Sequence, residues 1–296
     1  MNETAMQLAG EEPVCDPPSR RADRGLRLVG LLLLVILVIV LYGIVESWSI
    51  RLETVEIPLR GFPSAAQGMK LLQISDLHCR PGLGSTREVA RLVSGISASL
   101  MVITGDFKQA GGSPDLAVEG GSIVLDAVKS RMPVYAVSGN HDSPAIMQRL
   151  AQRGVRVLDN QSVPLLPGLW LAGWNPYRKR HPNLGEVFGT VPPGEFIILI
   201  SHSPDVVLEE SASRAKLILA GHTHGGQIRL PWIRPFTTLT RLGTRYAGGL
   251  YPWREGFLYV NRGIGTTTVP FRMYAAPEIT TILLRAMPGN VENPLN

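Results

Sequence analysis

The segment Leu28–Val45 most constrains what this chain can fold into, because it runs LVGLLLLVILVIVLYGIV without a single charge. A helix of this length spans the hydrocarbon core of a bilayer with little tilt. We therefore predict one N-terminal transmembrane anchor over residues 28–45. A cleaved signal peptide is the main alternative, but the run is longer than a usual signal-peptide core and no small-x-small cleavage site follows it. A buried core helix is the other alternative.

The charges that flank the apolar segment predict its orientation. Four arginines lie closely before it, whereas a comparable stretch after it holds two. They are Arg20, Arg21, Arg24 and Arg27 before the segment, and Arg51 and Arg60 after it. Positively charged flanks stay on the cytoplasmic side of a membrane. This bias predicts a single-pass protein with a cytoplasmic N-terminal tail over residues 1–27 and everything after Val45 outside the cytoplasm.

Beyond the anchor, the chain predicts one large α/β domain. Residues 46–69, rich in Pro and Gly, are interpreted as a linker with a short strand, residues 70–286 as the domain, and residues 287–296 as a C-terminal tail. Up to residue 153, short apolar runs alternate with helix-like stretches, which is typical of βαβ units and a largely parallel sheet. Short runs broken by Pro and Gly between residues 155 and 172 predict an antiparallel meander.

The net charge of +5 would fit an acidic partner such as a phosphate group or an anionic membrane. The basic residues are scattered along the chain, however, so we predict no specific nucleic-acid partner. An arginine-biased genome would produce the same excess of positive charge.

Polar motifs directly follow five of the predicted strands. The motifs are Asp76-Leu77-His78, Gly105-Asp106, Gly139-Asn140-His141-Asp142, Ser201-His202 and Gly221-His222-Thr223-His224. In open α/β sheets the functional crevice lies beyond the carboxyl ends of the strands, so these residues are expected to meet at one edge. Each motif alone is common in proteins, but five in order are not. The glycines would let the backbone turn sharply and approach a substrate closely.

The residue types in these motifs suit a pair of divalent-metal sites. Residues two apart in an extended segment face the same side, so Asp76 with His78, and His222 with His224, can point inward together. Carboxylate, imidazole and amide oxygen suit Mn, Fe, Zn or Co. The absence of thiolate ligands argues against a structural zinc cage.

The array resembles the calcineurin-like metallophosphoesterase family, whose pattern is D-x-H, G-D, G-N-H-D/E, a lone H and G-H-x-H. The match extends from about Lys70 to Leu284, with the expected residue type at every motif position. Residues 221–227, 259–265 and 277–279 are similar to a bacterial, membrane-associated branch that includes phosphodiesterases and hydrolases of UDP-2,3-diacylglucosamine. The resemblance implies a four-layer α/β/β/α sandwich. Together with the predicted transmembrane helix, the bacterial branch places the expected protein in the cytoplasmic membrane of a bacterium.

The resemblance also implies a role for each residue of the array. One divalent ion would be held by Asp76, His78, Asp106 and His224, and the other by Asp106, Asn140, His202 and His222, with Asp106 bridging. His141 would face the phosphate without binding metal, and Asp142 would orient its imidazole, unless Asp142 only begins the next helix. Arg80 is close enough to His78 to contact a phosphate, although a solvent-facing loop arginine is the commoner case.

The implied reaction is hydrolysis of a phosphodiester or pyrophosphate bond by metal-activated water, without a covalent intermediate. A phosphomonoesterase of the same fold, including a protein phosphatase, is the first alternative. A non-catalytic metal-binding scaffold is the second. A scaffold would be expected to have lost ligands or His141, and none of these residues is missing.

Two stretches that mix aromatic and arginine residues bear on the substrate, residues 174–181 and 232–254. Such residues suit an amphipathic substrate or a membrane interface, although ordinary solvated loops have the same composition. We hypothesise that both stretches meet a lipid-linked phosphoester near the bilayer. A nucleotide-linked lipid is the other candidate, but UDP-linked precursors belong on the cytoplasmic face, which conflicts with a domain outside the cytoplasm.

Overall fold

The computed structural model describes residues 20–82, 84–177 and 183–287. Most of the two predicted tails, and residues 178–181 of the first aromatic stretch, lie outside the described residues. The chain divides into two compact units, Met1–Leu41 and Tyr42–Asn296, and each is considered by itself.

Helix α1 (Arg20–Trp48) contains the predicted span. Within the described parts of the chain, its segment Arg24–Trp48 is the one helix long and apolar enough to cross a membrane. Leucine-rich sequence without proline favours the helix, and its apolar side chains from Leu26 to Leu41 are exposed, as lipid-facing side chains would be. From Tyr42 onward, the last turns of α1 belong to the second unit.

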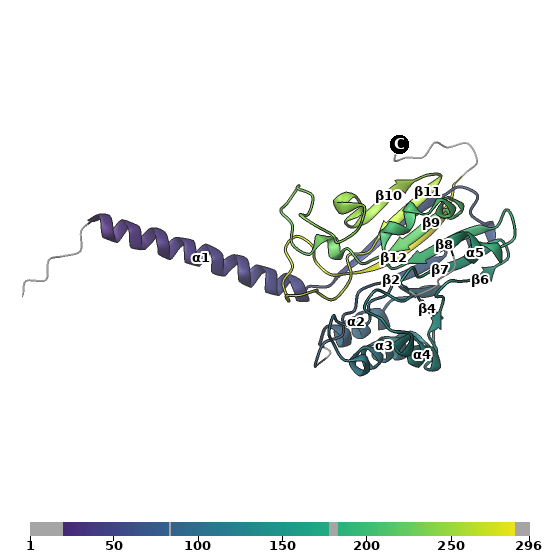
Figure 1. The fold of residues 1–296 in the computed structure, drawn as a ribbon, viewed down its shortest axis with the longest axis horizontal. Helices are drawn as coiled ribbons and strands as arrows, with labels where there is room; N and C mark the ends of the chain where they lie inside the picture. Colours follow the sequence, from purple (N-terminus) through teal and green to yellow (C-terminus); the bar gives the residue numbers. More distant parts are fainter. Residues whose placement is uncertain (1–19, 83, 178–182, 288–296) are drawn as a thin grey trace, which may run out of the picture. The chain divides into compact units, whose positions relative to one another are not determined.

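The first sheet of the second unit has the strand order β1-β12-β2-β3-β4-β5. Its strands are β1 (Arg51–Leu59), β12 (Glu278–Ala286), β2 (Lys70–Ile74), β3 (Leu100–Ile103), β4 (Val134–Ala136) and β5 (Arg156–Val157). Strands β2 to β5 are parallel, and their crossover helices are α2 (Gly84–Ser94), α3 (Pro114–Val128) and α4 (Pro144–Gln152). These helices lie together against one face of the sheet (Figure 1). The βαβ prediction is confirmed for this half of the chain.

The second sheet has the order β10-β11-β9-β8-β7-β6. Its strands are β6 (Gln161–Leu166), β7 (Leu169–Trp174), β8 (Phe196–Ser201), β9 (Leu217–Ala220), β10 (Gly249–Trp253) and β11 (Gly256–Val260). The central strands are parallel and the two edge strands pair antiparallel. The meander predicted for residues 155–172 is wrong in part, because β5 joins the first sheet parallel to β4 and only β6 and β7 form an antiparallel pair.

The two sheets pack face to face and give the predicted four layers. In β3, Leu100 and Val102 enter the core between the sheets, whereas Met101 and Ile103 face the helices. Both faces of these strands are buried, which explains their continuous apolar runs. A third apolar cluster lies under α5 (Leu184–Gly189) and short 3-10 helices on the outer face of the second sheet.

The segment from residue 46 to 69, interpreted above as a linker with a short strand, contributes the nine-residue strand β1 to the first sheet. Strand β1 pairs parallel with β12 from Arg51 opposite Glu278 to Leu59 opposite Ala286. Ile57 is buried in the core between the sheets. An edge strand tolerates proline, which explains why the Pro in this segment does not prevent pairing.

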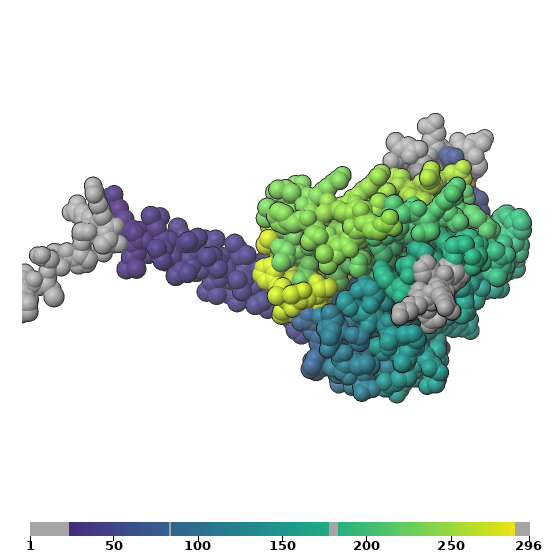
Figure 2. Space-filling view, in the orientation of Figure 1, coloured from purple at the N-terminus to yellow at the C-terminus, as the bar shows by residue number. Residues whose placement is uncertain are grey.

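The connection between β9 and β10 lies beside the connection between β11 and β12. Hydrogen bonds join Gln227 and Arg229 of the first to Met273 of the second. In Figure 2 these are the light-green and yellow surfaces that adjoin each other. Both connections follow the carboxyl ends of parallel strands, and the first contains the last of the five motifs.

We expect Ile57→Ala to lower the free energy of unfolding by about 2–5 kcal/mol, because it leaves a cavity between the sheets. Leu52→Ala, in the same strand but exposed, should change it by less than about 0.5 kcal/mol. Urea unfolding of the full chain in detergent measures both. Equal effects of the two substitutions would show that β1 does not pack on the core.

Candidate metal centre

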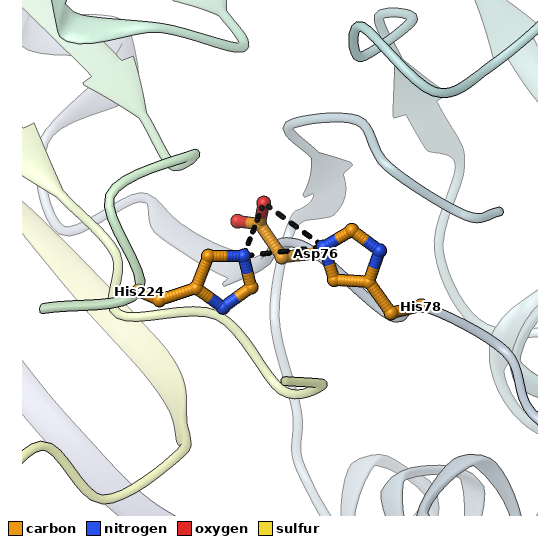
Figure 3. A group of neighbouring side chains, drawn as sticks. All are labelled: Asp76, His78 and His224. Carbon is orange, nitrogen blue, oxygen red and sulfur yellow. Dashed lines mark hydrogen bonds and ion pairs between the residues drawn. The ribbon is translucent and has the colours of Figure 1, made fainter. Parts of the chain in front are cut away.

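Three predicted ligands, Asp76, His78 and His224, form a buried cluster whose ligand atoms all lie within 4.8 Å of one another. The Nε2 atoms of His78 and His224 are 3.1 Å apart, and Nε2 of His224 lies 3.5 Å from Oδ1 of Asp76 (Figure 3). That carboxylate oxygen is buried and has no hydrogen-bond partner. A buried carboxylate oxygen without a donor is rare, and its position opposite two imidazole nitrogens fits a divalent cation.

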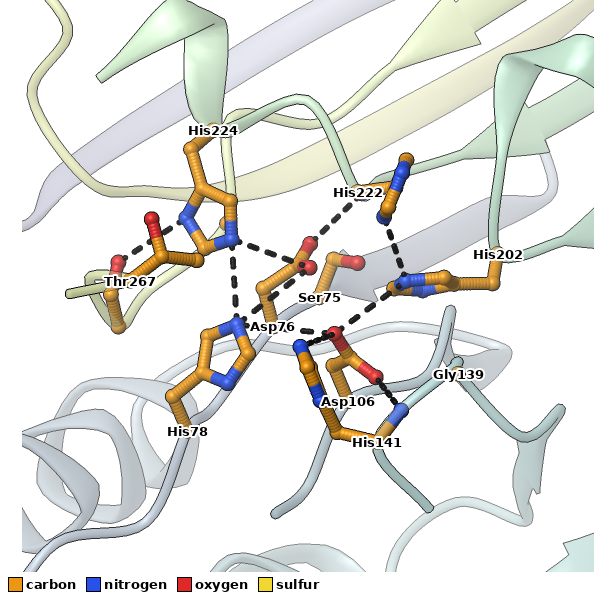
Figure 4. Close-up of polar contacts among 12 residues, drawn as sticks. Ser75, Asp76, His78, Asp106, Gly139, His141, His202, His222, His224 and Thr267 are labelled. Carbon is orange, nitrogen blue, oxygen red and sulfur yellow. Dashed lines mark hydrogen bonds and ion pairs between the residues drawn. The ribbon is translucent and has the colours of Figure 1, made fainter. Parts of the chain in front are cut away.

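A second cluster comprises Asp106, His202 and His222, whose ligand atoms also lie within 4.8 Å of one another. Nε2 of His202 lies 3.0 Å from Nδ1 of His222 and 3.4 Å from Oδ2 of Asp106 (Figure 4). The side-chain oxygen of Asn140 lies 3.1 Å from the same Nε2 atom of His202. The four residues predicted for the second ion are thus together.

Asp106 lies between the two clusters. Its Oδ2 atom is 3.6 Å from Nε2 of His78 in the first cluster and 3.4 Å from Nε2 of His202 in the second. Its other oxygen, Oδ1, accepts a hydrogen bond from the backbone N–H of His141 at 2.9 Å. One carboxylate oxygen therefore faces both groups of ligands, as a bridging ligand would.

Backbone carbonyls orient three of the imidazoles. Nδ1 of His78 lies 3.0 Å from the carbonyl of Lys108, and Nδ1 of His202 lies 2.7 Å from that of Thr104. Nδ1 of His224 is likewise 3.2 Å from the carbonyl of Gly265. An Nδ1–H that donates to such a carbonyl leaves Nε2 free as a metal ligand, which is the usual arrangement around metal-binding histidines.

The charges of the site favour ionised carboxylates. Burial acts to raise the pKa of Asp106, but the nearby imidazoles of His202 and His78 and the N–H of His141 outweigh it, so this pKa lies below its ordinary value. Burial lowers the pKa of His202, and the charge of Asp106 reverses this and raises it to about 10. A divalent ion held there would take the place of such a proton, because metal ligands must be deprotonated.

Five of the predicted ligands have a left-handed backbone conformation. The φ angles are 53° at Asp76, 41° at His78, 55° at Asp106, 70° at His222 and 51° at His224. For residues other than glycine this conformation costs on the order of 1–3 kcal/mol each, and it persists only where the surroundings enforce it. The motif segments are therefore not the simple extended segments that the two-residue spacing predicts.

Glycines allow the ligand loops to approach one another. A Cβ atom on Gly139 would lie 2.0 Å from Oδ1 of Asp106, and one on Gly221 would lie 1.8 Å from Oγ of Ser75. The sequence predicted that these glycines let the backbone approach a substrate closely. In the structure, the groups approached are side chains of the neighbouring strand ends.

Asp142 differs from its predicted role as the residue that orients His141. Its carboxylate accepts hydrogen bonds from the backbone N–H groups of Phe107, Lys108 and Gly139, at 3.3, 3.1 and 3.0 Å. Burial, followed by the charge of Asp106, raises its pKa to about 6. The side chain therefore ties the Asp106 loop to the Asn140 loop, and the helix start next to it is capped by Ser143.

His141 and Arg80 lie at the edge of the clusters. The imidazole of His141 is 29% exposed, with Nε2 4.0 Å from Oδ2 of Asp106, and it lines a cavity of about 630 Å³. Arg80 and His78 line a smaller cavity of about 70 Å³. The guanidinium of Arg80 donates to Oε1 of Gln109 and to the carbonyl of Thr266.

Arg272, a fully buried arginine behind the first cluster, was not predicted from the sequence. Its guanidinium donates to the carbonyls of Gly263, Gly265 and Ala275 at 3.0, 2.5 and 2.7 Å, and lies 3.3 Å from Nδ1 of His224. Burial lowers its pKa to about 10. It occupies a loop with no periodic pattern, so nothing in the sequence marks it as buried.

Two sheets in four layers and two adjoining clusters of carboxylate and imidazole at the strand ends define a metal-dependent hydrolase. The chain belongs to the calcineurin-like phosphoesterase family, whose model matches residues 69–226. It is thus a metallophosphoesterase, as the sequence motifs predicted.

Three relatives illustrate the range of the family. The chain is 28% identical to phosphodiesterase YaeI of Escherichia coli, over 78% of this chain and 88% of that protein. It is 24% identical to the UDP-2,3-diacylglucosamine pyrophosphatase LpxG of Chlamydia muridarum, over 72% and 82%. It is 27% identical to a transmembrane protein with metallophosphoesterase domain of Danio rerio, over 89% of this chain and 64% of that protein.

We expect Gly139→Ala to weaken binding of at least one metal ion by on the order of tenfold or more, because the new methyl group displaces the carboxylate of Asp106. Gly189 has open space around its Cα, so Gly189→Ala is the matched control and should bind metal normally. Isothermal titration of the metal-stripped proteins with Mn²⁺ measures this. Unaltered affinity in Gly139→Ala would contradict the packing described for Asp106.

Proposed function

We propose that this protein is a membrane-anchored, dinuclear metal-dependent phosphoesterase that hydrolyses a phosphodiester or pyrophosphate bond. The observation that carries the proposal is the carboxylate of Asp106, with one oxygen 3.6 Å and 3.4 Å from imidazole nitrogens of two separate clusters. The names of the bacterial relatives, a phosphodiesterase and a pyrophosphatase, agree with this reaction class.

The donor set fits two divalent ions drawn from Mn, Fe, Zn and Co. Asp76, His78 and His224 with Asp106 would hold one ion, and Asp106 with Asn140, His202 and His222 would hold the other. When bound, such a pair supplies hydroxide at neutral pH and neutralises charge on the phosphoryl group.

His141 is the residue that we propose acts on the leaving group. Its imidazole is partly exposed to the cavity, while its backbone N–H is fixed by Asp106. A histidine in this position can donate a proton to the departing oxygen, a role worth about 10²–10⁴ in rate. Arg80 is proposed to meet a non-reacting oxygen of the substrate phosphate, because it lines a cavity with His78.

We expect His141→Ala to retain both metal ions and to lose turnover of bis-p-nitrophenyl phosphate by about 10²–10⁴, because only the proton donor is removed. Steady-state kinetics with Mn²⁺, together with metal analysis of the same samples, measures both effects. The control is His202→Ala, which should lose metal as well as activity. Loss of metal from His141→Ala, or unaltered turnover, would refute its role.

The same assay tests the other proposed features. Arg80→Ala should raise KM more than it lowers kcat if the guanidinium binds the ground-state phosphate.

Faster turnover of the diester than of p-nitrophenyl phosphate is expected, and the reverse preference would favour a phosphomonoesterase. A folded protein that binds two ions and hydrolyses neither ester would favour a scaffold.

We also propose that α1 anchors the protein in a bacterial cytoplasmic membrane with the catalytic unit outside the cytoplasm, as the flanking arginines predict. In a bacterial host, alkaline phosphatase fused after residue 296 should be active and green fluorescent protein fused there should be dark. The opposite pair of signals would place the catalytic unit inside, where nucleotide-linked lipids lie.

A further inference from the structure

Residues 230–239, the apolar loop, carry five exposed large apolar side chains within the connection from β9 to β10. Trp232 is fully exposed, Phe236 is 76% and Leu239 78% exposed, and Leu230 and Ile233 are also exposed. Beyond α1, the other exposed large apolar side chains of the described residues are scattered: Leu52, Leu166, Tyr177, Leu208, Val269 and Tyr274. Single exposed apolar residues are ordinary, whereas a cluster of this kind marks an interaction surface.

The base of the apolar loop is fixed to the segment 270–274. The backbone N–H of Arg229 donates to the carbonyl of Met273 at 3.0 Å, and the N–H of Met273 donates to Gln227 at 2.9 Å. These bonds hold the two connections side by side, as in Figure 2.

The same segment 270–274 holds the last turns of α1, within the second unit. The N–H of Arg272 donates to the carbonyl of Gly43 at 3.1 Å, and the N–H of Tyr274 donates to the buried carboxylate of Glu46 at 2.7 Å. Gly43 packs against the ring of Phe271 so closely that a Cβ atom added to Gly43 would lie 2.1 Å from a ring carbon. The point where the chain leaves its apolar segment and the apolar loop are therefore attached to one short segment.

The connection that contains the apolar loop, residues 221–248, carries four arginines and no Asp or Glu: Arg229, Arg234, Arg241 and Arg245. The acidic side chain bonded to it is Asp205, which accepts hydrogen bonds from the backbone N–H groups of Arg241 and Leu242. Arg234 lies within the loop and is exposed. Basic residues beside exposed Trp, Phe and Leu fit the headgroups of an anionic bilayer.

The apolar loop also forms a wall of the catalytic cavity. The cavity of about 630 Å³ is lined by Asp106, His141 and His222 and also by Phe236 and Leu239. A phosphoester placed at the metal ligands would direct its substituent toward these two apolar side chains.

We propose that residues 230–239 insert into the surface of an anionic lipid bilayer, so that the catalytic cavity opens onto the lipid and takes a phosphoester with an acylated substituent. The proposal of insertion rests on the exposed apolar side chains of the loop and on its attachment to the last turns of α1. The substrate class rests on the proposed function.

The first test locates the loop in the full chain. Trp232→Cys, in a Cys15→Ser background, is labelled with an environment-sensitive nitrobenzoxadiazole dye and reconstituted in vesicles of equal parts phosphatidylcholine and phosphatidylglycerol. Cys79 is buried and should not react. Leu166→Cys is the control. Leu166 lies near residues 67–69, which precede β2, whereas the metal ligands follow the other end of β2.

We expect blue-shifted emission and quenching by brominated lipids at position 232 and neither at position 166. Vesicles of phosphatidylcholine alone should give weaker quenching, because the arginines then lack anionic partners. Emission typical of water at both positions would overturn insertion. Blue-shifted emission at 232 that rises with protein concentration and is not quenched by brominated lipids would overturn insertion and show that a second copy covers the loop.

The second test concerns the substrate. The double variant Trp232→Ser with Ile233→Ser alters side chains that do not line the cavity. It should hydrolyse a diacylglycerol p-nitrophenyl phosphodiester in the same vesicles about tenfold more slowly, since two apolar anchors are lost, and bis-p-nitrophenyl phosphate at the normal rate. Leu166→Ser should match the wild type on both esters.

The two tests separate the proposals. Equal turnover of the lipid ester by the double variant and the wild type would overturn the substrate class. If the wild type hydrolyses neither ester, the proposed function fails together with the substrate class, and the dye emission still decides insertion.

Discussion

The carboxylate of Asp106 is the group on which the site depends. It is buried, it faces histidines from both clusters, and it accepts the N–H of His141. These contacts require four strand ends, those of β2, β3, β4 and β8, to converge. The convergence is possible because Gly139 has no side chain and because Asp142 accepts three backbone N–H groups that would otherwise be buried without partners. Removal of such an acceptor lowers the stability of the fold, because each buried N–H group then lacks a hydrogen bond.

Much of the fold followed from the sequence, because strands buried on both faces appear as continuous apolar runs. β2, β3, β8 and β9 were found in this way, and the α/β/β/α layers followed from the family resemblance. The edge elements were harder to predict. β1 mixes exposed and buried positions and contains Pro58, so only a short strand within a linker was predicted there. β10 was not predicted at all, because its partly exposed residues lack a clear period.

In the site too, some features could be predicted from the sequence and others could not. The five motifs identified residues that the structure brings together, since spacing after a strand is a local property. The role of Asp142 depends instead on contacts with Phe107 and Lys108, far away in sequence, and these were not visible in the motif. The strained φ angles of the ligands and the burial of Arg272 are also products of tertiary packing.

The attachment of Glu46 to Tyr274 bears on how the protein matures. A secretory protease that cut just after the apolar run would remove Gly43 and leave the N–H of Arg272 without its acceptor. It would thereby loosen the arginine that contacts His224. The last turns of α1 are thus a packed part of the second unit, and Arg272 links them to His224 of the first cluster.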